Sequence, residues 1–324
     1  MEGLSEEYKT QRSPTMDNNI NSNINAEIMK GAKVLLCPTY DLAKTVANVD
    51  NAPYATVEAE YGEHVITGSP RLEKWATLAH HDSRSSNPAP CVWNSICEEN
   101  VSPMLPKTII VSHLDLDTLG GIGLLLGYFN PEEQEFWNAA AYIDCKGPHH
   151  VLEVPEKAQK QLRAFWAYNE YHRPPMFSRD SITDVTALVA EYFVLLDKIA
   201  HMDTEVISAG EVWEAKKKEQ TEGSLVYESK NIRGFCGPYF TASSYCGSDT
   251  MVRPCTISYS TKKSSVTLAF EDGGKKHNAA EIMREIFGAG AGGHAGIAGT
   301  PRGGVYNVFD LCKVIDYVET LLNK

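Results

Sequence analysis

The chain has 324 residues, about twice the usual length of one domain, which predicts two domains with enough apolar material for a real core. Hydrophobic residues make up 43% and charged residues 22% of the chain, a composition that excludes a wholly disordered or fibrous protein. Lys and Arg number 30 against 42 Asp and Glu, a formal net charge of -12, which disfavours long nucleic acid as a partner and still permits a small anionic substrate.

Residues 1–29 are polar and Asn-rich, and we predict that they form a disordered tail outside the fold. They carry no apolar stretch like that of a secretion signal, and the chain has no run of about 18 apolar residues. We therefore expect a soluble, cytoplasmic protein that does not bind membranes. The cysteines are scattered without a C-x-x-C pair, which indicates reduced thiols.

The first predicted elements beyond the tail are short strands. Apolar runs predict strands over 33–37 (KVLLC), 61–68 (YGEHVITG) and 75–79 (WATLA). A nearly continuous β-branched run predicts a buried strand over 107–112 (KTIIVS), and 119–128 (LGGIGLLLGY) follows as a buried helix. Strand, polar turn and helix make an α/β unit, so we expect a parallel sheet in this part of the chain.

The middle of the chain is predicted to be mostly helical. The segment 136–143 (FWNAAAYI) is interpreted as one more strand, with Asp144 at its end. Helices are predicted over 156–166, 181–201 and 210–220.

Beyond residue 222 the pattern changes to short strands separated by Gly and Asp turns. The strands are predicted at 224–229, 237–245, 256–261 and 264–270, and helices at 278–287 and 308–322. This change predicts an N-terminal α/β domain (30–221) with a parallel sheet and a smaller C-terminal α+β domain (222–324).

The strongest local signal is the sequence HLDLD, directly after the predicted strand at 107–112. On an extended segment residues i, i+2 and i+4 point to one side, so His113, Asp115 and Asp117 can converge beyond the strand end. One imidazole and two carboxylates form a metal-binding set, at the edge where open α/β sheets place ligands. The alternative is that these residues cap the next helix and are solvated.

A fourth carboxylate and a histidine pair lie further along the chain. Asp144 ends the segment 136–143, and His149 and His150 follow it closely. An acidic ligand there could bridge two metal ions about 3.5 to 4 Å apart, the separation in two-metal hydrolases. A surface turn with a lone carboxylate is the alternative.

A second histidine pair, His80-His81, ends the predicted strand at 75–79. Its position at a strand end favours a functional site, and an exposed polar turn is the alternative.

The segment 288–304 is rich in glycine and follows the predicted helix 278–287. Glycine lets the backbone approach a ligand and present N–H groups to an anion, and His294 and Arg302 add directional donors. We interpret the segment as a ligand-binding loop. It is only weak evidence for a G-x-G-x-x-G nucleotide motif, because it follows a helix and not a strand.

Together, HLDLDTLGG, an acidic residue at a predicted strand end, a His-His pair and GGHAGIAG resemble the DHH phosphoesterase superfamily with its C-terminal DHH-associated domain. The resemblance covers about residues 107–310. In that family an α/β domain carries a two-manganese site, and a Gly-Gly-Gly-His segment of the second domain binds substrate; here Ala291 replaces the first of these glycines. No literal Asp-His-His occurs, and the pairs His149-His150 and His80-His81 remain two equal candidates for it.

The resemblance implies two Mn²⁺ per chain, with Mg²⁺ as the alternative metal. The residues that it implies are the metal ligands His113, Asp115, Asp117, Asp144, His149 and Asp203, the catalytic histidines His80, His81 and His150, and the substrate-binding residues Gly292, Gly293, His294 and Arg302. Asp197 is an alternative to Asp203 as the last acidic ligand.

The function implied is two-metal hydrolysis of a small phosphate ester or anhydride, such as a short oligonucleotide, a nucleotide, a cyclic dinucleotide or pyrophosphate. The resemblance places the active site for this reaction in the cleft between the two domains. A nucleotide-binding protein of the same fold that does not catalyse a reaction is the first alternative, and metal-dependent hydrolysis of an amide or ester is the second. The sequence leaves a homodimer open.

Overall fold

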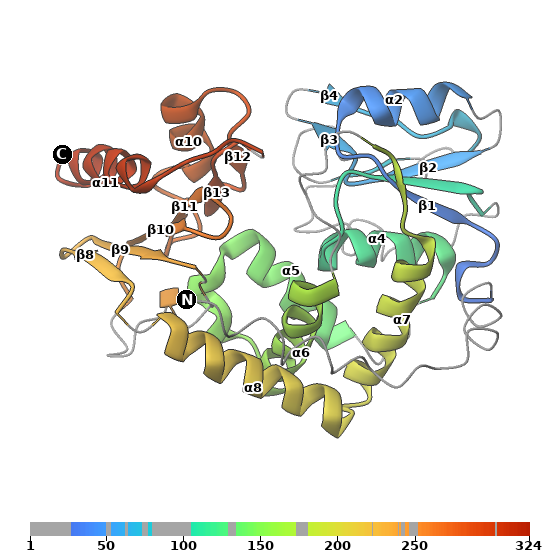
Figure 1. Cartoon of the computed structure of the whole chain (residues 1–324), viewed down its shortest axis with the longest axis horizontal. Coiled ribbons are helices and arrows are strands. Elements are labelled where there is room, and N and C mark those ends of the chain that lie inside the picture. Colours follow the sequence, from blue (N-terminus) through green and yellow to red (C-terminus); the bar gives the residue numbers. More distant parts are fainter. Residues whose placement is uncertain are drawn as a thin grey trace, which may run out of the picture.

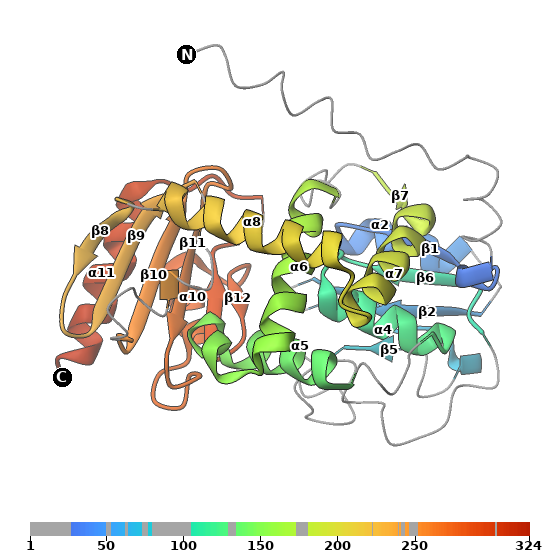
Figure 2. The same cartoon turned by 90° about the horizontal axis from the view of Figure 1, so that it is seen from below.

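The computed structural model describes residues 27–49, 53–61, 64–72, 77–79, 105–128, 134–172, 181–221, 223–238, 240, 244–245, 252–301 and 303–324. Two separate sheets organise these residues, one at each end of the molecule (Figure 1). A group of helices lies between them, and the longest of these, α8 (Thr204–Thr221), runs from one sheet region to the other (Figure 2).

The N-terminal sheet is parallel except at one edge, which confirms the predicted fold class. Its strand order is β5-β2-β6-β1-β7, and only β7 pairs antiparallel, with β1. The strands are β1 (Lys33–Leu36), β2 (Tyr54–Val57), β5 (Thr77–Leu78), β6 (Thr108–Val111) and β7 (Thr183–Asp184), and β3 (Glu60–Tyr61) and β4 (His64–Val65) form a separate hairpin.

Helices cover both faces of this sheet. The helices of this part are α2 (Tyr40–Val49), α4 (Leu116–Leu126), α5 (Gln134–Lys146), the 3-10 helix η3 (Pro148–Glu153), α6 (Glu156–His172) and α7 (Thr186–Ala200). Helices α4 and α7 pack on one face, where Ile109 and Val111 enter the main core, and α2 packs on the other, where Ile110 is buried. All four residues of β6 are buried, as predicted for a strand covered on both faces.

The C-terminal sheet is mixed and has helices on one face. Its order is β12-β13-β11-β10-β9-β8, with β9 and β10 parallel and the other pairs antiparallel. The elements are β8 (Leu225–Glu228), β9 (Ile232–Gly237), β10 (Cys255–Ser260), β11 (Ser265–Phe270), α10 (Ala279–Phe287), β12 (Gly292–Gly293), β13 (Ile297–Gly299) and α11 (Val308–Leu322). Met283 of α10 and Val314 of α11 pack on Ile257 and Leu268 to form a second core.

The predicted strand at 136–143 is wrong, because this segment belongs to helix α5. Its three consecutive alanines have the highest helix propensity, and Trp137 and Ala141, four residues apart, are buried on the same side. Asp144 therefore lies in the last turn of a helix and not at the end of a strand.

Two predicted helix starts are also wrong. Helix α7 starts at Thr186, because 183–184 pairs with β1 and the Asp184 carboxylate accepts hydrogen bonds from the Thr186 N–H (3.0 Å) and hydroxyl (2.6 Å). Helix α8 starts at Thr204 and not at Gly210, because the Asp203 carboxylate caps it, accepting from the N–H of Val206 at 3.1 Å.

Other segments also differ from the expectation. The predicted strand 61–68 is split between β3 and β4, and a strand forms at 232–237 where none was expected. Residues 239 and 241–243 of the predicted strand 237–245 lie outside the described residues. The glycine-rich segment contains the two short strands β12 and β13.

The close crossing of α6 and α8 depends on Gly210, and Gly210→Ala is expected to lower the free energy of unfolding by about 2 kcal/mol. A Cβ at this position would lie 2.5 Å from the backbone N and 2.7 Å from the Cα of Ala164 in α6, so the helices must separate. This loss exceeds the gain of about 1 kcal/mol that alanine offers over glycine in a helix. Urea denaturation measures the change, with Ser208→Ala on the exposed side of α8 as control; equal stability of both variants would contradict the tight crossing.

Candidate active site

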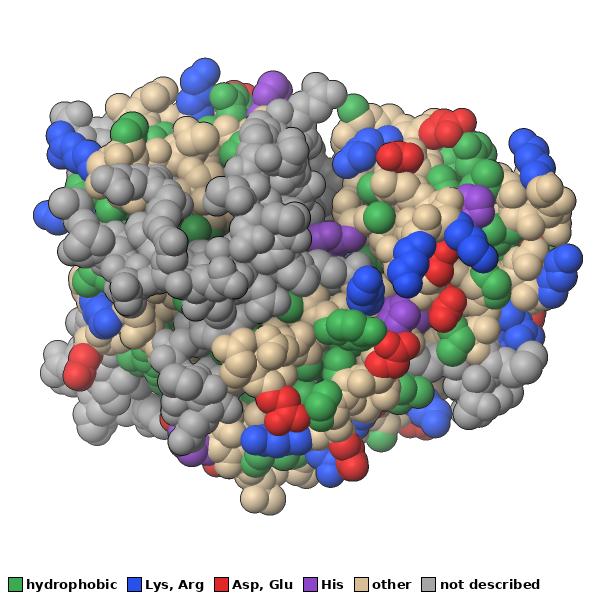
Figure 3. All heavy atoms as spheres, turned by 180° about the vertical axis from the view of Figure 1, so that it is seen from behind, with side chains coloured by type: hydrophobic (Ala, Val, Ile, Leu, Met, Phe, Trp, Pro, Cys, Tyr) green, Lys and Arg blue, Asp and Glu red, His purple; other side chains and the backbone are tan. Residues whose placement is uncertain are grey.

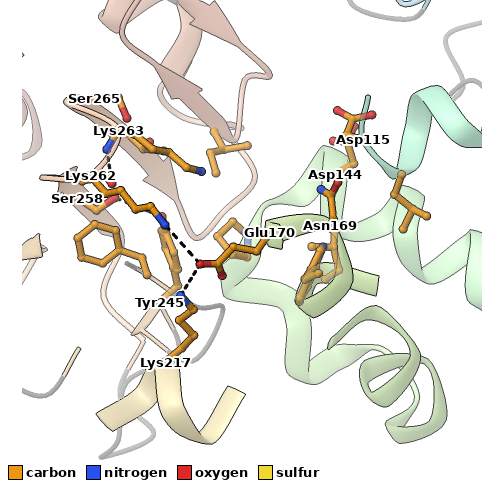
Figure 4. Close-up of a pocket in the computed structure, with 18 of the residues that line it drawn as sticks. Asp115, Asp144, Asn169, Glu170, Lys217, Tyr245, Ser258, Lys262, Lys263 and Ser265 are labelled. Carbon is orange, nitrogen blue, oxygen red and sulfur yellow. Dashed lines mark hydrogen bonds and ion pairs between the residues drawn. The ribbon is translucent and has the colours of Figure 1, made fainter. Parts of the chain in front are cut away.

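A cavity of about 950 Å³ lies between the two parts of the molecule, within the range of small-molecule sites. Helices α4, α5, α6 and α8 line one side, and β10, β11 and residues 303–305 line the other. Figure 4 shows Asp115 and Asp144 on one side of this pocket and Lys262 and Lys263 on the opposite side.

The first wall of the cavity is built where β6 turns into α4. His113 follows the strand, with its Nδ1 2.8 Å from the Ser112 hydroxyl and its Nε2 2.8 Å from a carboxylate oxygen of Asp115. Asp115 is the N-cap of α4 and accepts a hydrogen bond from the Thr118 N–H at 3.0 Å. Asp115 therefore caps the helix with one carboxylate oxygen, as the alternative interpretation of HLDLD predicts, and its other oxygen meets His113.

The Asp115 carboxyl is held in its ionised form. Burial acts to raise its pKa, but the charge of His113 and the hydrogen bonds from His113 and Thr118 outweigh burial and hold the pKa well below the usual range. The Asp115 carboxylate is therefore an anion at every physiological pH.

Asp144 and His294 meet across the cleft, although they belong to different parts of the fold. The Nε2 of His294 lies 3.0 Å from a carboxylate oxygen of Asp144, and both side chains are partly buried. Asp144 lines the same cavity as Asp115 and Asp117. Three of the predicted metal ligands and one predicted substrate-binding residue thus lie in or beside one cavity.

The glycine-rich segment positions His294 through a tight hairpin. Strands β12 and β13 pair, and the His294 N–H donates to the Ile297 carbonyl at 2.8 Å. Gly293, one residue before His294, has a φ of 143°. Residues with a side chain larger than hydrogen rarely adopt this backbone conformation. Glycine is therefore required at the point where the chain turns His294 towards Asp144.

Three predicted site residues have other partners. The buried His149 has its Nε2 2.8 Å from the Thr256 hydroxyl, and the Nδ1 of His150 lies 2.8 Å from Glu153. Asp203 caps α8. None of these three residues lines the cavity, so the structure does not bring them to the wall that contains Asp115, Asp117 and Asp144.

The burial of His149 is expected to make the stability of the protein depend on pH. Burial, assisted by the charge of His150, lowers its pKa from 6.5 to about 3. Between these values the unfolded chain binds a proton that the folded chain does not, so the free energy of unfolding falls as the pH drops, by about 1.4 kcal/mol per unit. His149→Gln is expected to remove this part of the slope between pH 6 and 4, measured by urea denaturation.

The control for that experiment is His172→Gln, at the exposed end of α6. The control should keep the slope of the original chain, and an unchanged slope in His149→Gln would contradict a neutral His149 in the folded state.

His80, His81 and Arg302 lie outside the described residues. Strand β5, which precedes the His80-His81 pair, runs parallel to β2, so the carboxyl ends of β5, β2 and β6 point to the same edge of the sheet.

Within the described part of the chain, no three His, Cys, Asp or Glu side chains are grouped closely enough to hold a metal ion. Two carboxylates of the cavity wall each meet an imidazole beside it, Asp115 with His113 and Asp144 with His294. The nitrogen and oxygen atoms of these side chains suit Mn²⁺. A complete set of ligands requires either that the two pairs move closer to each other or that additional residues contribute ligands.

The residues at the end of the cavity opposite Asp115 were not predicted from the sequence. Glu170 of α6 and Lys217 of α8 form an ion pair there, and Lys262 and Lys263 line the cavity from the turn between β10 and β11. The adjacent lysines in this turn were a visible signal, whereas Glu170 and Lys217 look like ordinary residues of polar helix faces.

Comparison with known proteins leaves the family open. No protein-family model and no curated protein matches the chain. It is similar to the solved structure of a pGpG-specific phosphodiesterase, PggH, from Vibrio cholerae, at 14% identity and a TM-score of 0.37, over 68% of this chain and 84% of that chain. A structure described as the DHH domain of a member of a ribosomal protein family matches at 12% identity and a TM-score of 0.39, over 92% and 89% of the two chains.

An uncharacterised protein from Helicobacter pylori G27 matches at 12% identity and a TM-score of 0.19, over 94% of this chain and 88% of that chain. Identities and TM-scores this low do not assign the chain to a family. None of the helices in the described ranges combines the length and apolarity needed to cross a bilayer.

Proposed function

We propose that the chain is a metal-dependent phosphoesterase of the DHH type, which hydrolyses a small phosphorylated substrate in the cavity between its two sheets. The observation that carries this proposal is the convergence of Asp115, Asp117 and Asp144 on one cavity that also contains lysines. Carboxylates suit hard divalent cations, and lysines suit phosphate oxygens. A cavity with both can hold a divalent ion at its acidic wall and neutralise further phosphate charge at the lysines opposite.

The metal ligands that we propose are His113, Asp115, Asp117 and Asp144, with His80 or His81 as additional ligands. Buried oxygens on Asp117 and Asp144 support this choice, because charged oxygens taken out of water are stabilised by a cation. Divalent ions held there, with Mn²⁺ as the proposed metal, would supply Lewis-acid chemistry and activate water as the nucleophile. His149, His150 and Asp203 are left out of this set, because they have structural partners away from the cavity.

The chain itself contributes charge and position. Asp115 stays ionised and orients His113, and Asp144 orients the His294 imidazole at the cavity wall. We propose His294, and Arg302 from its amino-acid type alone, as donors to non-bridging phosphate oxygens. The lysines at the other end neutralise further negative charge on the substrate.

The charge distribution supports a small substrate. The chain carries a net charge of -12, and on the face shown in Figure 3 basic and acidic side chains are interspersed over the described surface. Binding to a long strand depends on neutralising many phosphates with a continuous row of cations. A short oligonucleotide or a dinucleotide fits these charges better.

The test is hydrolysis of a linear dinucleotide, a cyclic dinucleotide and pyrophosphate with and without Mn²⁺, together with the number of metal ions bound per chain. We expect turnover of at least one compound that requires Mn²⁺ and stops with a chelator. Absence of turnover on all three, with fewer than two metal ions bound, would contradict the proposal.

A binding protein that does not hydrolyse its ligand is the second candidate. It is favoured by the observation that no three potential metal ligands are grouped within the described residues. Nucleotide binding without turnover in the same experiment would support this second candidate.

A further inference from the structure

We propose that Ser112 is a positioning residue for the candidate metal site. Its hydroxyl fixes which ring nitrogen of His113 carries the proton, and so keeps the other nitrogen directed at Asp115. The effect on the imidazole concerns the metal-free protein. Its consequence for metal binding rests on the proposed function, because it assumes that His113 and Asp115 hold a divalent ion.

The Ser112 hydroxyl directs its proton to a backbone carbonyl. Ser112 follows β6, and Glu58 follows β2, the neighbouring parallel strand. The Ser112 hydroxyl donates to the Glu58 carbonyl oxygen between these two strand ends, and both residues are buried, with 8% and 2% of their surface exposed. A serine hydroxyl has a single proton, so Ser112 can bind a second partner only as an acceptor.

The second partner is the imidazole of His113. Its Nδ1 lies 2.8 Å from the Ser112 hydroxyl oxygen. Because the hydroxyl proton is directed at Glu58, this hydrogen bond requires a proton on Nδ1, which is then the donor. The same ring places its Nε2 2.8 Å from a carboxylate oxygen of Asp115. Nε2 is therefore the nitrogen that faces the proposed metal ligand Asp115.

Without the hydroxyl, Asp115 would favour the opposite tautomer of His113. A carboxylate accepts hydrogen bonds, so it favours a proton on the nitrogen that faces it, which is Nε2. A neutral imidazole carries a single proton, so Nδ1 would then have none. A proton on Nε2 keeps a metal ion from that nitrogen, because the metal binds the lone pair of a neutral imidazole. Ser112 therefore opposes the tautomer that would block the site.

The backbone at Glu58 supports this role. Glu58 has a φ of 49°, a left-handed conformation that residues other than glycine rarely adopt. Its N–H donates to the carbonyl of Leu78 in β5 at 2.8 Å, and its own carbonyl accepts from Ser112, so Glu58 is bonded to the strands on both sides. Unfavourable backbone conformations that the surroundings hold in place are concentrated at functional sites.

The test is the position of the proton on His113 in metal-free protein. Histidine is labelled with ¹⁵N, and NMR spectra are recorded in EDTA at about pH 9, where an ordinary imidazole is neutral. The chemical shift of each ring nitrogen shows whether it carries a proton, and the signals of His113 are identified by their absence in His113→Gln. We expect a protonated Nδ1 in the original chain. In Ser112→Ala we expect Nδ1 without a proton and Nε2 with one.

The second measurement is the dissociation constant of Mn²⁺, obtained without substrate from the electron paramagnetic resonance of the free ion. Loss of a hydrogen bond that orients a metal-binding histidine typically weakens metal binding about tenfold to a hundredfold, and we expect this loss for Ser112→Ala. Ser112→Thr keeps the hydroxyl, so it should keep both the proton on Nδ1 and the original affinity. A role limited to tying the ends of β2 and β6 together would leave the tautomer unchanged.

Ser69→Ala is the matched control. Ser69 is also 8% exposed and belongs to the same domain. Its N–H donates to the carbonyl of Tyr54 at 2.8 Å, so it lies at the amino end of β2, whereas the candidate site is at the carboxyl end. The control should keep the tautomer of His113 and the affinity for Mn²⁺. The melting temperature verifies that all variants are folded.

The proposal is overturned if Nδ1 keeps its proton in Ser112→Ala, if Mn²⁺ binds to Ser112→Ala as tightly as to the original chain, or if Ser69→Ala loses as much affinity. These outcomes leave the proposed function intact. Absence of Mn²⁺ binding by the original chain would instead contradict the proposed function, and a change of tautomer in Ser112→Ala would still support the effect of Ser112 on His113.

Discussion

Asp115→Asn is expected to lower Mn²⁺-dependent turnover by about a thousandfold while the protein stays folded. A metal ligand contributes several kcal/mol to stabilising the charge of the transition state, and about 1.4 kcal/mol corresponds to a factor of ten. Asparagine replaces the ionised carboxylate that faces His113 with a neutral amide. Its side-chain oxygen can still accept from the Thr118 N–H, so the cap of α4 is kept.

The measurements are kcat/KM, the amount of bound Mn²⁺ and the melting temperature. Asp184→Asn is the matched control, because Asp184 is also a carboxylate that accepts from a backbone N–H at a helix start, at 3.0 Å from Thr186, but does not line the cavity. Asp115→Ala separates the two roles further, since it should lose about 1 kcal/mol of stability with the cap. Full activity of Asp115→Asn would place the chemistry elsewhere.

Gly293→Ala is expected to have the second largest effect, a loss of about 2 to 3 kcal/mol in stability and of about tenfold to a hundredfold in turnover. A Cβ on Gly293 would lie 2.5 Å from the Ile297 carbonyl oxygen and 2.9 Å from the Cα of Ala298, and the φ of 143° is unfavourable for alanine. The hairpin of β12 and β13 must therefore shift, and His294 moves away from Asp144.

Urea denaturation and kcat/KM measure these losses. Gly299→Ala in the same hairpin is the control, because its Cβ would be 3.6 Å from the nearest atom, the Val266 carbonyl oxygen, which is an ordinary contact. If Gly293→Ala acts through His294, then adding it to His294→Ala should reduce turnover little further. Additive losses in the double variant would show that the hairpin affects activity by another route.

Much of the fold could be predicted because local patterns specify it. The β-branched run KTIIVS became the fully buried strand β6, and LGGIGLLLGY lies mostly within α4. The last helix has the predicted bounds, and its start carries a capping box in which Asn307 and Asp310 satisfy each other's backbone N–H groups. Such signals act over a few residues and need no knowledge of the remaining chain.

The errors occurred where local patterns are ambiguous. The apolar segment before Asp144 is as long as a strand, and only its packing as part of α5 shows that it is a helix. His149 and His150 look like site residues in the sequence, but a histidine pair does not reveal whether its partners are metal ions or neighbours such as Thr256 and Glu153.

By itself, the sequence determined that HLDLD follows a buried strand and opens a helix, and hence that Asp115 stands at the carboxyl edge of a parallel sheet. Only the tertiary structure decided that Asp144 meets His294 and that Glu170 meets Lys217 and Lys262. The physical reason is range: strand alternation, helix propensity and capping act between near neighbours in the chain. Contacts between distant charges depend instead on how whole helices and sheets pack, which no single segment specifies.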